Sequence, residues 1–328
     1  MLSSGRRCPF VLVVVALAFV LTQAGSGQQP ASSSPSGPRL NRVIDLFKQG
    51  KPAFGTFVQN FAVRTAMSVS RSDLDFILID MEHAPYDVAQ LQIFLMAMTD
   101  KQTILKKGNL QPNVVPMVRI PQYGRENLGF IVKQVLDVGP FGLMFPHIDT
   151  AEQARMAVQV SRYPQKKGAP DFNPEGLRGN APTNAVWYWG VPGRDYADRA
   201  DAWPLDPQGE LLLSMQIESP EAVNNIDSIL AVPGVGAIFI GPNDLSYHLG
   251  NPGNADTPEE EAAIDKVLQA CRKKNIPVGL TAYSGEVVTK RLKQGFTFLA
   301  IGQDIGLTAP IDATLKAGRA FTKGPAGN

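Results

Sequence analysis

Cysteine is scarce in this sequence, and neither sign of charge forms a block. The 328 residues include 2 cysteines, and one of them, Cys8, precedes an apolar run near the start of the chain. We therefore expect no intramolecular disulfide in the mature protein, with Cys271 as a buried structural thiol. Lysine and arginine total 31 against 30 aspartates and glutamates, and no basic stripe occurs. This balance argues against a nucleic-acid partner.

An apolar run long enough to cross a membrane is also missing. The run from Phe10 to Leu21 is shorter than the ~20 residues that span a bilayer. Because Arg6 and Arg7 precede it and small residues follow, residues 1–27 are predicted to be a signal peptide, with an uncleaved anchor as the alternative. Residues 28–39 are predicted to be a flexible linker. We expect an exported protein, periplasmic or secreted, with no membrane contact beyond the signal segment.

From about residue 40, short apolar runs alternate with segments of helical period. The expected strands are Ala53–Val58, Phe76–Asp80, Val114–Ile120, Phe141–Pro146, Leu211–Glu218, Ala237–Pro242, Pro277–Tyr283 and Phe296–Gly302. The expected helices are Val88–Thr99, Arg125–Val138, Ala151–Arg162, Pro220–Leu230, Pro258–Lys274, Gly285–Gln294 and Thr308–Ala320. This alternation predicts a single-domain (β/α)₈ TIM barrel over residues 40–328. An open doubly wound sheet is the alternative, but no Gly-rich phosphate-binding motif follows the first strand.

One segment interrupts this alternation. Residues 165–208 are rich in Pro, Gly, Asp and Arg, and they contain all 3 tryptophans of the chain. The segment is too long for an ordinary connection, so we interpret it as an inserted loop that is functional or is ordered locally by its aromatic side chains. Packing over a barrel rim or against a neighbouring subunit would account for those aromatics.

Charged and titratable side chains gather where the expected strands end. They are Asp80, Glu82, His83, Arg119, His147, Glu218 and Asp244. Each carboxylate alone could cap a helix or be a solvated charge. His147 could contact substrate or belong to the rim, and His248 is more simply structural. Because the carboxyl ends of barrel strands form the ligand-binding face, their joint placement predicts an active site.

The residue types at these ends indicate a chemistry. Glu218 and Asp244 are oxygen donors that suit a hard divalent cation such as Mg²⁺ or Mn²⁺. Arg119 is a fixed cation that can hold a carboxylate or an oxyanion. His83 is one of 3 histidines, and histidine is the side chain that most often acts as a general base near neutral pH. No lysine ends an expected strand, so a Schiff-base route is not indicated.

Several motifs also follow one another in a distinctive order. They are Phe76–Pro85 (FILIDMEHAP), Pro116–Pro121 (PMVRIP), Val135–Gly139 (VLDVG), Arg162–Pro164 (RYP), Gln216–Ser219 (QIES) and Phe239–Ser246 (FIGPNDLS). From about Ala53 to Ala309 the chain resembles the HpcH/HpaI aldolases, typified by 4-hydroxy-2-oxoheptanedioate aldolase. The resemblance implies a class II, metal-dependent pyruvate aldolase. Such an enzyme reversibly cleaves a 4-hydroxy-2-oxo acid to pyruvate and an aldehyde through a metal-bound pyruvate enolate.

The resemblance further implies roles for individual residues. His83 would be the general base, Asp137 would raise its basicity, and Asp80 would support the same network. Arg119 would hold the keto or enolate oxygen. The divalent cation, Mg²⁺, Mn²⁺ or Co²⁺, would bind to Glu218 and Asp244. The pyruvyl group would be held by Gln216, Gly241, Pro242, Asn243 and Asp244. A homo-oligomer, trimer or hexamer, is also implied.

Two other functions stay open at the level of sequence. One is an exported oxo-acid-binding protein without turnover, although pure binding needs no general base. The other is an acyl-CoA lyase of the same superfamily, acting on an ester such as malyl-CoA or citramalyl-CoA, although the pair Glu82-His83 favours the aldolase. In the family an Arg-Gly pair soon follows Arg-Tyr-Pro, whereas residues 165–177 intervene here. The resemblance implies that this loop shapes the aldehyde side of the pocket.

Overall fold

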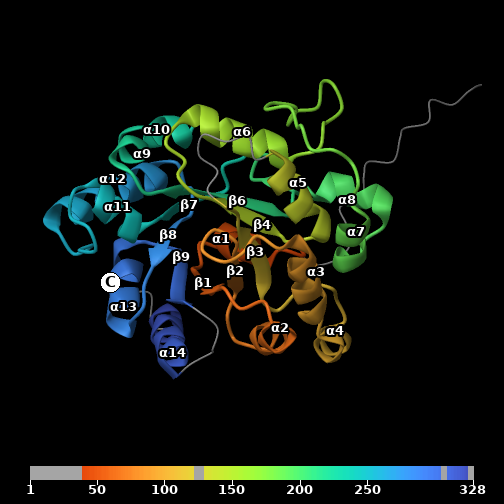
Figure 1. The fold of residues 1–328 in the computed structure, drawn as a ribbon, viewed down its shortest axis with the longest axis horizontal. Helices are drawn as coiled ribbons and strands as arrows, with labels where there is room; N and C mark the ends of the chain where they lie inside the picture. Colours follow the sequence, from red (N-terminus) through yellow and green to blue (C-terminus); the bar gives the residue numbers. More distant parts are fainter. Residues whose placement is uncertain (1–38, 122–128, 304–308, 324–328) are drawn as a thin grey trace, which may run out of the picture. The chain divides into compact units, whose positions relative to one another are not determined.

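The strands of the protein form a closed parallel barrel with helices around it (Figure 1). A computed structural model describes residues 39–121, 129–303 and 309–323. In this part of the chain, eight of the nine strands follow one another around the ring in the order β1–β2–β3–β4–β6–β7–β8–β9. Pairing of β1 with β9 and of β4 with β6 closes the ring. The predicted TIM barrel is confirmed.

The observed elements agree closely with the expected ones. The strands are β1 (Ala53–Val58), β2 (Phe76–Asp80), β3 (Val115–Arg119), β4 (Gly142–Phe145), β5 (Ala202–Trp203), β6 (Leu211–Ile217), β7 (Ala237–Ile240), β8 (Val278–Thr281) and β9 (Phe298–Gln303). The helices are α1 (Arg42–Lys48), α2 (Val63–Ser70), α3 (Val88–Ala97), α4 (Lys101–Lys107), α5 (Gly129–Val138), α6 (Ala151–Ser161), α7 (Thr183–Trp189), α8 (Gly193–Arg199), α9 (Pro220–Asn224), α10 (Ile226–Ile229), α11 (Pro242–His248), α12 (Pro258–Lys273), α13 (Gly285–Gln294) and α14 (Ala309–Lys323). All expected strands are present, whereas β5 and helices α1, α2, α4, α7, α8 and α11 are additional.

The predictions for the N-terminus fall on residues that lie outside the described ranges. The signal peptide, residues 1–27, and the linker as far as residue 38 therefore stay predictions. The expected helices Arg125–Val138 and Thr308–Ala320 also begin outside these ranges. Within the described ranges, no helix combines the length and the apolarity needed to cross a membrane.

Large aromatic side chains fill the interior of the barrel. The ring centroid of Phe298 lies 4.6 Å from that of Phe76 and 5.7 Å from that of Phe239. A Cβ atom at Gly55 would lie 2.4 Å from the ring of Phe76, so this packing requires glycine in β1. Because side chains fill the interior and helices cover the outside, the strands are buried at almost every position.

The insertion is ordered by its own aromatic and charged contacts. Trp189 is buried, its ring stacks on Phe141 with centroids 4.6 Å apart, and its Nε1 donates to the carbonyl oxygen of Gly139 at 2.7 Å. The Nη2 of Arg162, just after α6, donates to Asp201 Oδ2 at 2.7 Å. Since Phe141 precedes β4, the aromatics pack near the amino end of the barrel. These contacts agree with local ordering of the segment by its aromatic side chains, one of the two interpretations given above.

Candidate active site

Three possible metal ligands meet at the carboxyl ends of neighbouring barrel strands. His147 follows β4, Glu218 follows β6, and Asp244 lies in the first turn of α11 after β7. One ligand atom from each residue lies within 4.8 Å of the other two. Two carboxylates and an imidazole are donors that divalent cations accept. The structure thus brings Glu218 and Asp244 together, as expected, and places beside them His147, whose role the sequence left open.

The environment of Glu218 favours a bound cation. The side chain is buried, and its two oxygens accept hydrogen bonds of 2.7 Å from the backbone N–H of His147 and from Nε2 of Gln216. Burial raises the pKa of Glu218 to about 8; the hydrogen bond from His147 opposes this rise and the charge of Asp244 adds to it. A cation would reverse the effect, because it stabilises the ionised carboxylate.

Gly241 allows the backbone to approach this carboxylate. A Cβ atom at position 241 would lie 2.4 Å from Glu218 Oε2 and 2.9 Å from Gln216 Nε2. Among the described residues, the buried Oε1 of Gln216 has no hydrogen-bond partner. An unused acceptor beside clustered carboxylates is expected where a ligand completes the polar contacts. The residues present therefore fit a divalent cation.

We expect Gly241→Ala to weaken binding of Mn²⁺ by about 10- to 100-fold, because the added methyl group displaces the Glu218 carboxylate. Calorimetric titration of the protein with Mn²⁺ measures the affinity. Gly193→Ala is the matched control, since a Cβ atom at Gly193 meets nothing within 4 Å. Equal Mn²⁺ affinity in Gly241→Ala and the wild type would contradict the assignment of this cluster as the cation site.

Arg119 is held rigidly at the end of β3. Its Nε and Nη2 donate to the two oxygens of Asp80 at 2.9 and 2.6 Å, and Nη1 lies 3.1 Å from Glu82 Oε2. The guanidinium also stacks over the ring of Phe57, 4.5 Å from its centroid. Burial alone would raise the pKa of Asp80, but the hydrogen bonds and charge of Arg119 hold it below its ordinary value. Arg119 therefore presents a fixed positive charge to the site.

His83 lies after β2 with its imidazole accessible. The side chain is 53 % exposed, and Nε2 lies 3.7 Å from Glu82 Oε2. Its backbone N–H donates to Asp80 Oδ1 at 3.3 Å. Burial raises the pKa of Glu82 to about 7, although the positive charge of Arg119 opposes the rise. The histidine thus combines access to the site with a backbone anchored to Asp80.

Asp137, the expected partner of His83, has other partners. On α5, its Oδ2 accepts from Lys133 Nζ at 2.6 Å and its Oδ1 from Arg178 Nη2 at 3.1 Å. In the part of the chain that the structure describes, neither a hydrogen bond nor an ion pair joins Asp137 to His83. The structure does not bring the two together within one chain, and the role of Asp137 stays a prediction.

One cavity of about 380 Å³ contains most of the expected site residues. It is lined by Phe57, His83, Arg119, Gln216, Phe239, Gly241, Pro242, Asn243, Asp244, Thr281, Tyr283 and Gln303. The expected pyruvyl-binding residues all line it. Within one chain no lining residue comes from 165–177, and the expected role of this loop in shaping the aldehyde side stays a prediction. Polar residues at the ends of β8 and β9, which the sequence interpretation missed, line it as well.

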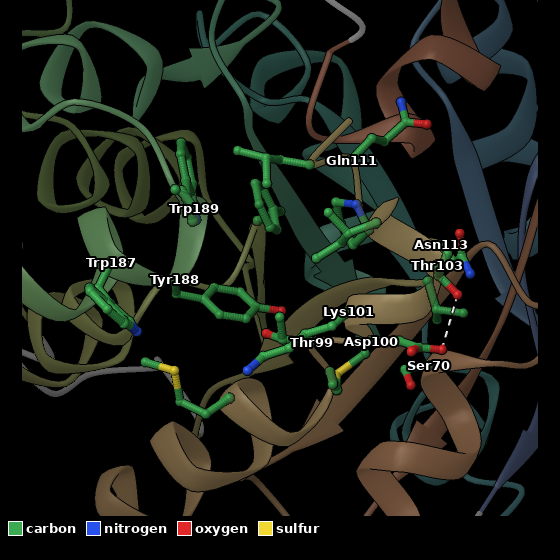
Figure 2. A pocket seen from close by; sticks show the side chains of 18 residues that line it. Ser70, Thr99, Asp100, Lys101, Thr103, Gln111, Asn113, Trp187, Tyr188 and Trp189 are labelled. Carbon is green, nitrogen blue, oxygen red and sulfur yellow. Dashed lines mark hydrogen bonds between the residues drawn. The ribbon is translucent and has the colours of Figure 1, made fainter. Parts of the chain in front are cut away.

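A second cavity, of about 420 Å³, lies beside α4 and α7 (Figure 2). Figure 2 shows the ring of Tyr188 pointing from α7 toward Thr99, with Trp187 and Trp189 on either side. Its walls are mainly apolar and aromatic side chains. None of the expected catalytic or metal-binding residues lines this cavity, so the candidate chemistry belongs to the smaller one.

Known proteins resemble the chain over most of its length. A family model described as HpcH/HpaI aldolase/citrate lyase matches residues 53–310. A 5-keto-4-deoxy-D-glucarate aldolase of Klebsiella pneumoniae is 35% identical over 250 residues, which cover 76% of this chain and 84% of the relative. A 2-dehydro-3,6-dideoxy-6-sulfogluconate aldolase of Pseudomonas putida is 30% identical over 264 residues, covering 80% and 90%. The crystal structure of a HpcH/HpaI aldolase/citrate lyase family protein from Burkholderia cenocepacia superposes with a TM-score of 0.67 at 27% identity, covering 86% of this chain and 98% of that one.

Proposed function

The chain belongs to the HpcH/HpaI aldolase/citrate lyase family, and we propose that this carbon–carbon lyase reversibly cleaves a 4-hydroxy-2-oxo acid to pyruvate and an aldehyde. The observation that carries the proposal is the shared cavity. Asp244 connects the cluster of His147 and Glu218 to the same cavity that His83 and Arg119 line. A cation site, a fixed positive charge and a candidate base are the parts that this reaction needs.

We propose Mg²⁺, Mn²⁺ or Co²⁺ as the cofactor, held by Glu218 and Asp244, with His147 as a further candidate ligand. When bound, the cation supplies positive charge that withdraws electrons from the 2-keto group and makes the methyl protons of pyruvate more acidic. A nitrogen ligand from the imidazole of His147 would make the site prefer Mn²⁺ and Co²⁺ to Mg²⁺, because Mg²⁺ favours oxygen ligands.

The chain's own residues then carry the steps. Gln216 and the backbone of residues 241–244 orient the pyruvyl group. In the condensation direction His83 accepts a proton from the methyl carbon, and a proton is delivered to the C4 alkoxide that forms when the new carbon–carbon bond is made. The cleavage direction reverses both transfers, from the 4-hydroxyl to the methyl carbon. Arg119 donates a hydrogen bond to the keto oxygen and stabilises the negative charge that develops there. Because Asp80 fixes the guanidinium in advance, this stabilisation requires little reorganisation.

The comparisons favour turnover over simple binding. The two relatives described above, which cover 76% and 80% of the chain, are named as aldolases, and neither name includes a thioester. They support the aldolase over an oxo-acid-binding protein or an acyl-CoA lyase. Export through the N-terminal segment and assembly into a trimer or hexamer stay proposals.

The proposal predicts carbon–carbon bond formation from pyruvate. Purified protein with Mn²⁺, pyruvate and a panel of short aldehydes should form 4-hydroxy-2-oxo acids, detected by mass spectrometry. Each product should be cleaved again when it is supplied alone with the enzyme. Absence of product for every aldehyde, together with pyruvate binding at the site, would favour the binding protein.

A further inference from the structure

The cavity has a second wall, opposite the candidate cation site. In the ring of eight strands, β9 lies across from β4 and β1 lies across from β6. Phe57 is near the end of β1, Thr281 ends β8, and Gln303 ends β9. With Tyr283, just after β8, they line the cavity. We call Thr281, Tyr283 and Gln303 the polar wall.

The polar wall offers hydrogen bonds but no charge. Tyr283 is 51% exposed, and its hydroxyl is hydrogen-bonded to the side chain of Thr281. Gln303 is also exposed while lining the cavity. Together these side chains provide hydroxyl and amide groups that both donate and accept. Such a wall suits a ligand that carries hydroxyl groups.

Among the residues that the structure describes, a negatively charged ligand would find no unpaired cation beside this wall. Among the described residues that line the cavity, the groups that can carry positive charge are His83 and Arg119. Arg119 is already paired with Asp80 and Glu82, and His83 lies beside Glu82. A carboxylate or phosphate at the polar wall would lose water without gaining an ion pair, which is unfavourable.

The reaction places the aldehyde on this side. Residues 216 and 241–244 and the cation cluster occupy the arc formed by β4, β6 and β7, so pyruvate lies there. The other strands of the ring are β8, β9, β1, β2 and β3. Because the ends of β2 and β3 carry His83 and Arg119, the aldehyde carbon approaches the pyruvate methyl carbon past β8, β9 and β1. We propose that the polar wall is the aldehyde subsite and that the enzyme selects a short, neutral, hydroxylated aldehyde. This inference rests on the proposed aldolase function.

The test compares three acceptors at fixed pyruvate and Mn²⁺. Glyceraldehyde carries hydroxyl groups, propanal has the same carbon chain without them, and succinic semialdehyde carries a carboxylate. We expect kcat/KM for glyceraldehyde to exceed that for each of the others by about tenfold or more. A preference for succinic semialdehyde, or equal values for glyceraldehyde and propanal, would overturn the inference.

Substitutions in the polar wall test whether its side chains determine which aldehyde the enzyme prefers. Tyr283→Phe and Thr281→Val remove hydroxyls with little change in shape, and each should lower the ratio of glyceraldehyde to propanal by about tenfold. Gln303→Arg should increase kcat/KM for succinic semialdehyde. Tyr247→Phe is the matched control, because Tyr247 is exposed on α11 and does not line the cavity. An unchanged ratio in Tyr283→Phe would contradict the assignment.

Exchange of pyruvate methyl protons with D₂O separates this inference from the proposed function. Exchange by the wild type without a preference for glyceraldehyde overturns only the aldehyde subsite. Failure of the wild type to exchange these protons, with any of the proposed cations, overturns the aldolase function and the subsite with it.

Discussion

Glu218→Gln is expected to lower the rate of pyruvate proton exchange by about 100-fold or more, because it removes a charged ligand of the cation. Glutamine keeps the shape of the side chain and can still accept the hydrogen bond from the backbone of His147, which reaches Oε1 of Glu218 at 2.7 Å. It cannot supply the negative charge. Exchange measured by NMR across a range of Mn²⁺ concentrations should show a higher Mn²⁺ requirement as well as a lower maximum.

Glu221→Gln is the matched control for this variant. Glu221 is an exposed residue in the first turn of α9, three positions along the chain from Glu218. We expect wild-type exchange and wild-type affinity for Mn²⁺ from it. If Glu218→Gln also retained both, the cluster of His147, Glu218 and Asp244 could not be the catalytic cation site.

Asp80→Asn is expected to reduce both activity and stability. The variant leaves the guanidinium of Arg119 buried without its bidentate carboxylate, which typically destabilises a fold by about 3–5 kcal/mol. The aldolase activity should fall as well, because the Arg119 guanidinium loses the hydrogen bonds of 2.6 and 2.9 Å to Asp80 that orient it. Urea unfolding at neutral pH and steady-state kinetics measure the two effects.

The pH dependence of this loss has a definite sign. Because the pKa of Asp80 is held below its ordinary value, the pair stabilises the fold fully above the pKa of the unfolded chain, about 3.9. The contribution is lost as the pH falls through the lower pKa of the folded state. The stability difference between wild type and Asp80→Asn should therefore shrink in acid. Asp195→Asn, which breaks the exposed pair with Arg194, should change stability little at any pH. A neutral effect of Asp80→Asn at pH 7 would contradict this account.

The barrel was predictable because both faces of its strands are buried. A strand such as Phe76–Asp80 is covered by helices on one side and by interior side chains on the other, so it reads as a continuous apolar run. Parallel order then places the ends of all strands on one face. The register of β2 and β3 aligns Asp80 with Arg119, so two of the expected catalytic residues became neighbours.

Contacts that depend on barrel closure were harder to foresee. His147 and Glu218 are 71 residues apart. They meet only because β4 pairs with β6 across the insertion. The backbone of His147 is also in the left-handed region, with φ of 51°, which sequence patterns indicate poorly outside glycine. The sequence could therefore name His147 as a candidate without choosing its partner.

Reasoning from the sequence alone was incomplete for one helix, for Asp137 and for one wall of the cavity. Helix α7 contains the run Val186, Trp187, Tyr188 and Trp189, residues of modest helix propensity. The buried ring of Trp189 stacks on Phe141 and holds the helix in place, whereas Trp187 is exposed. Asp137 was assigned to His83 by resemblance; within one chain it pairs with Lys133 and Arg178, so the assignment stays a prediction. The sequence interpretation missed the polar wall because Thr281 and Gln303 look like ordinary strand residues. Only closure of the barrel brings the ends of their strands to the same cavity.

Exchange of pyruvate methyl protons with D₂O tests the central claim most directly, because it requires the cation site and the base but no aldehyde. We expect the wild type to deuterate pyruvate with Mn²⁺, Co²⁺ or Mg²⁺, and a chelator to stop the reaction. His83→Ala should lower the rate by about 10²- to 10⁴-fold, the usual contribution of a general base. Exchange that persists unchanged with the chelator and in His83→Ala would contradict the account.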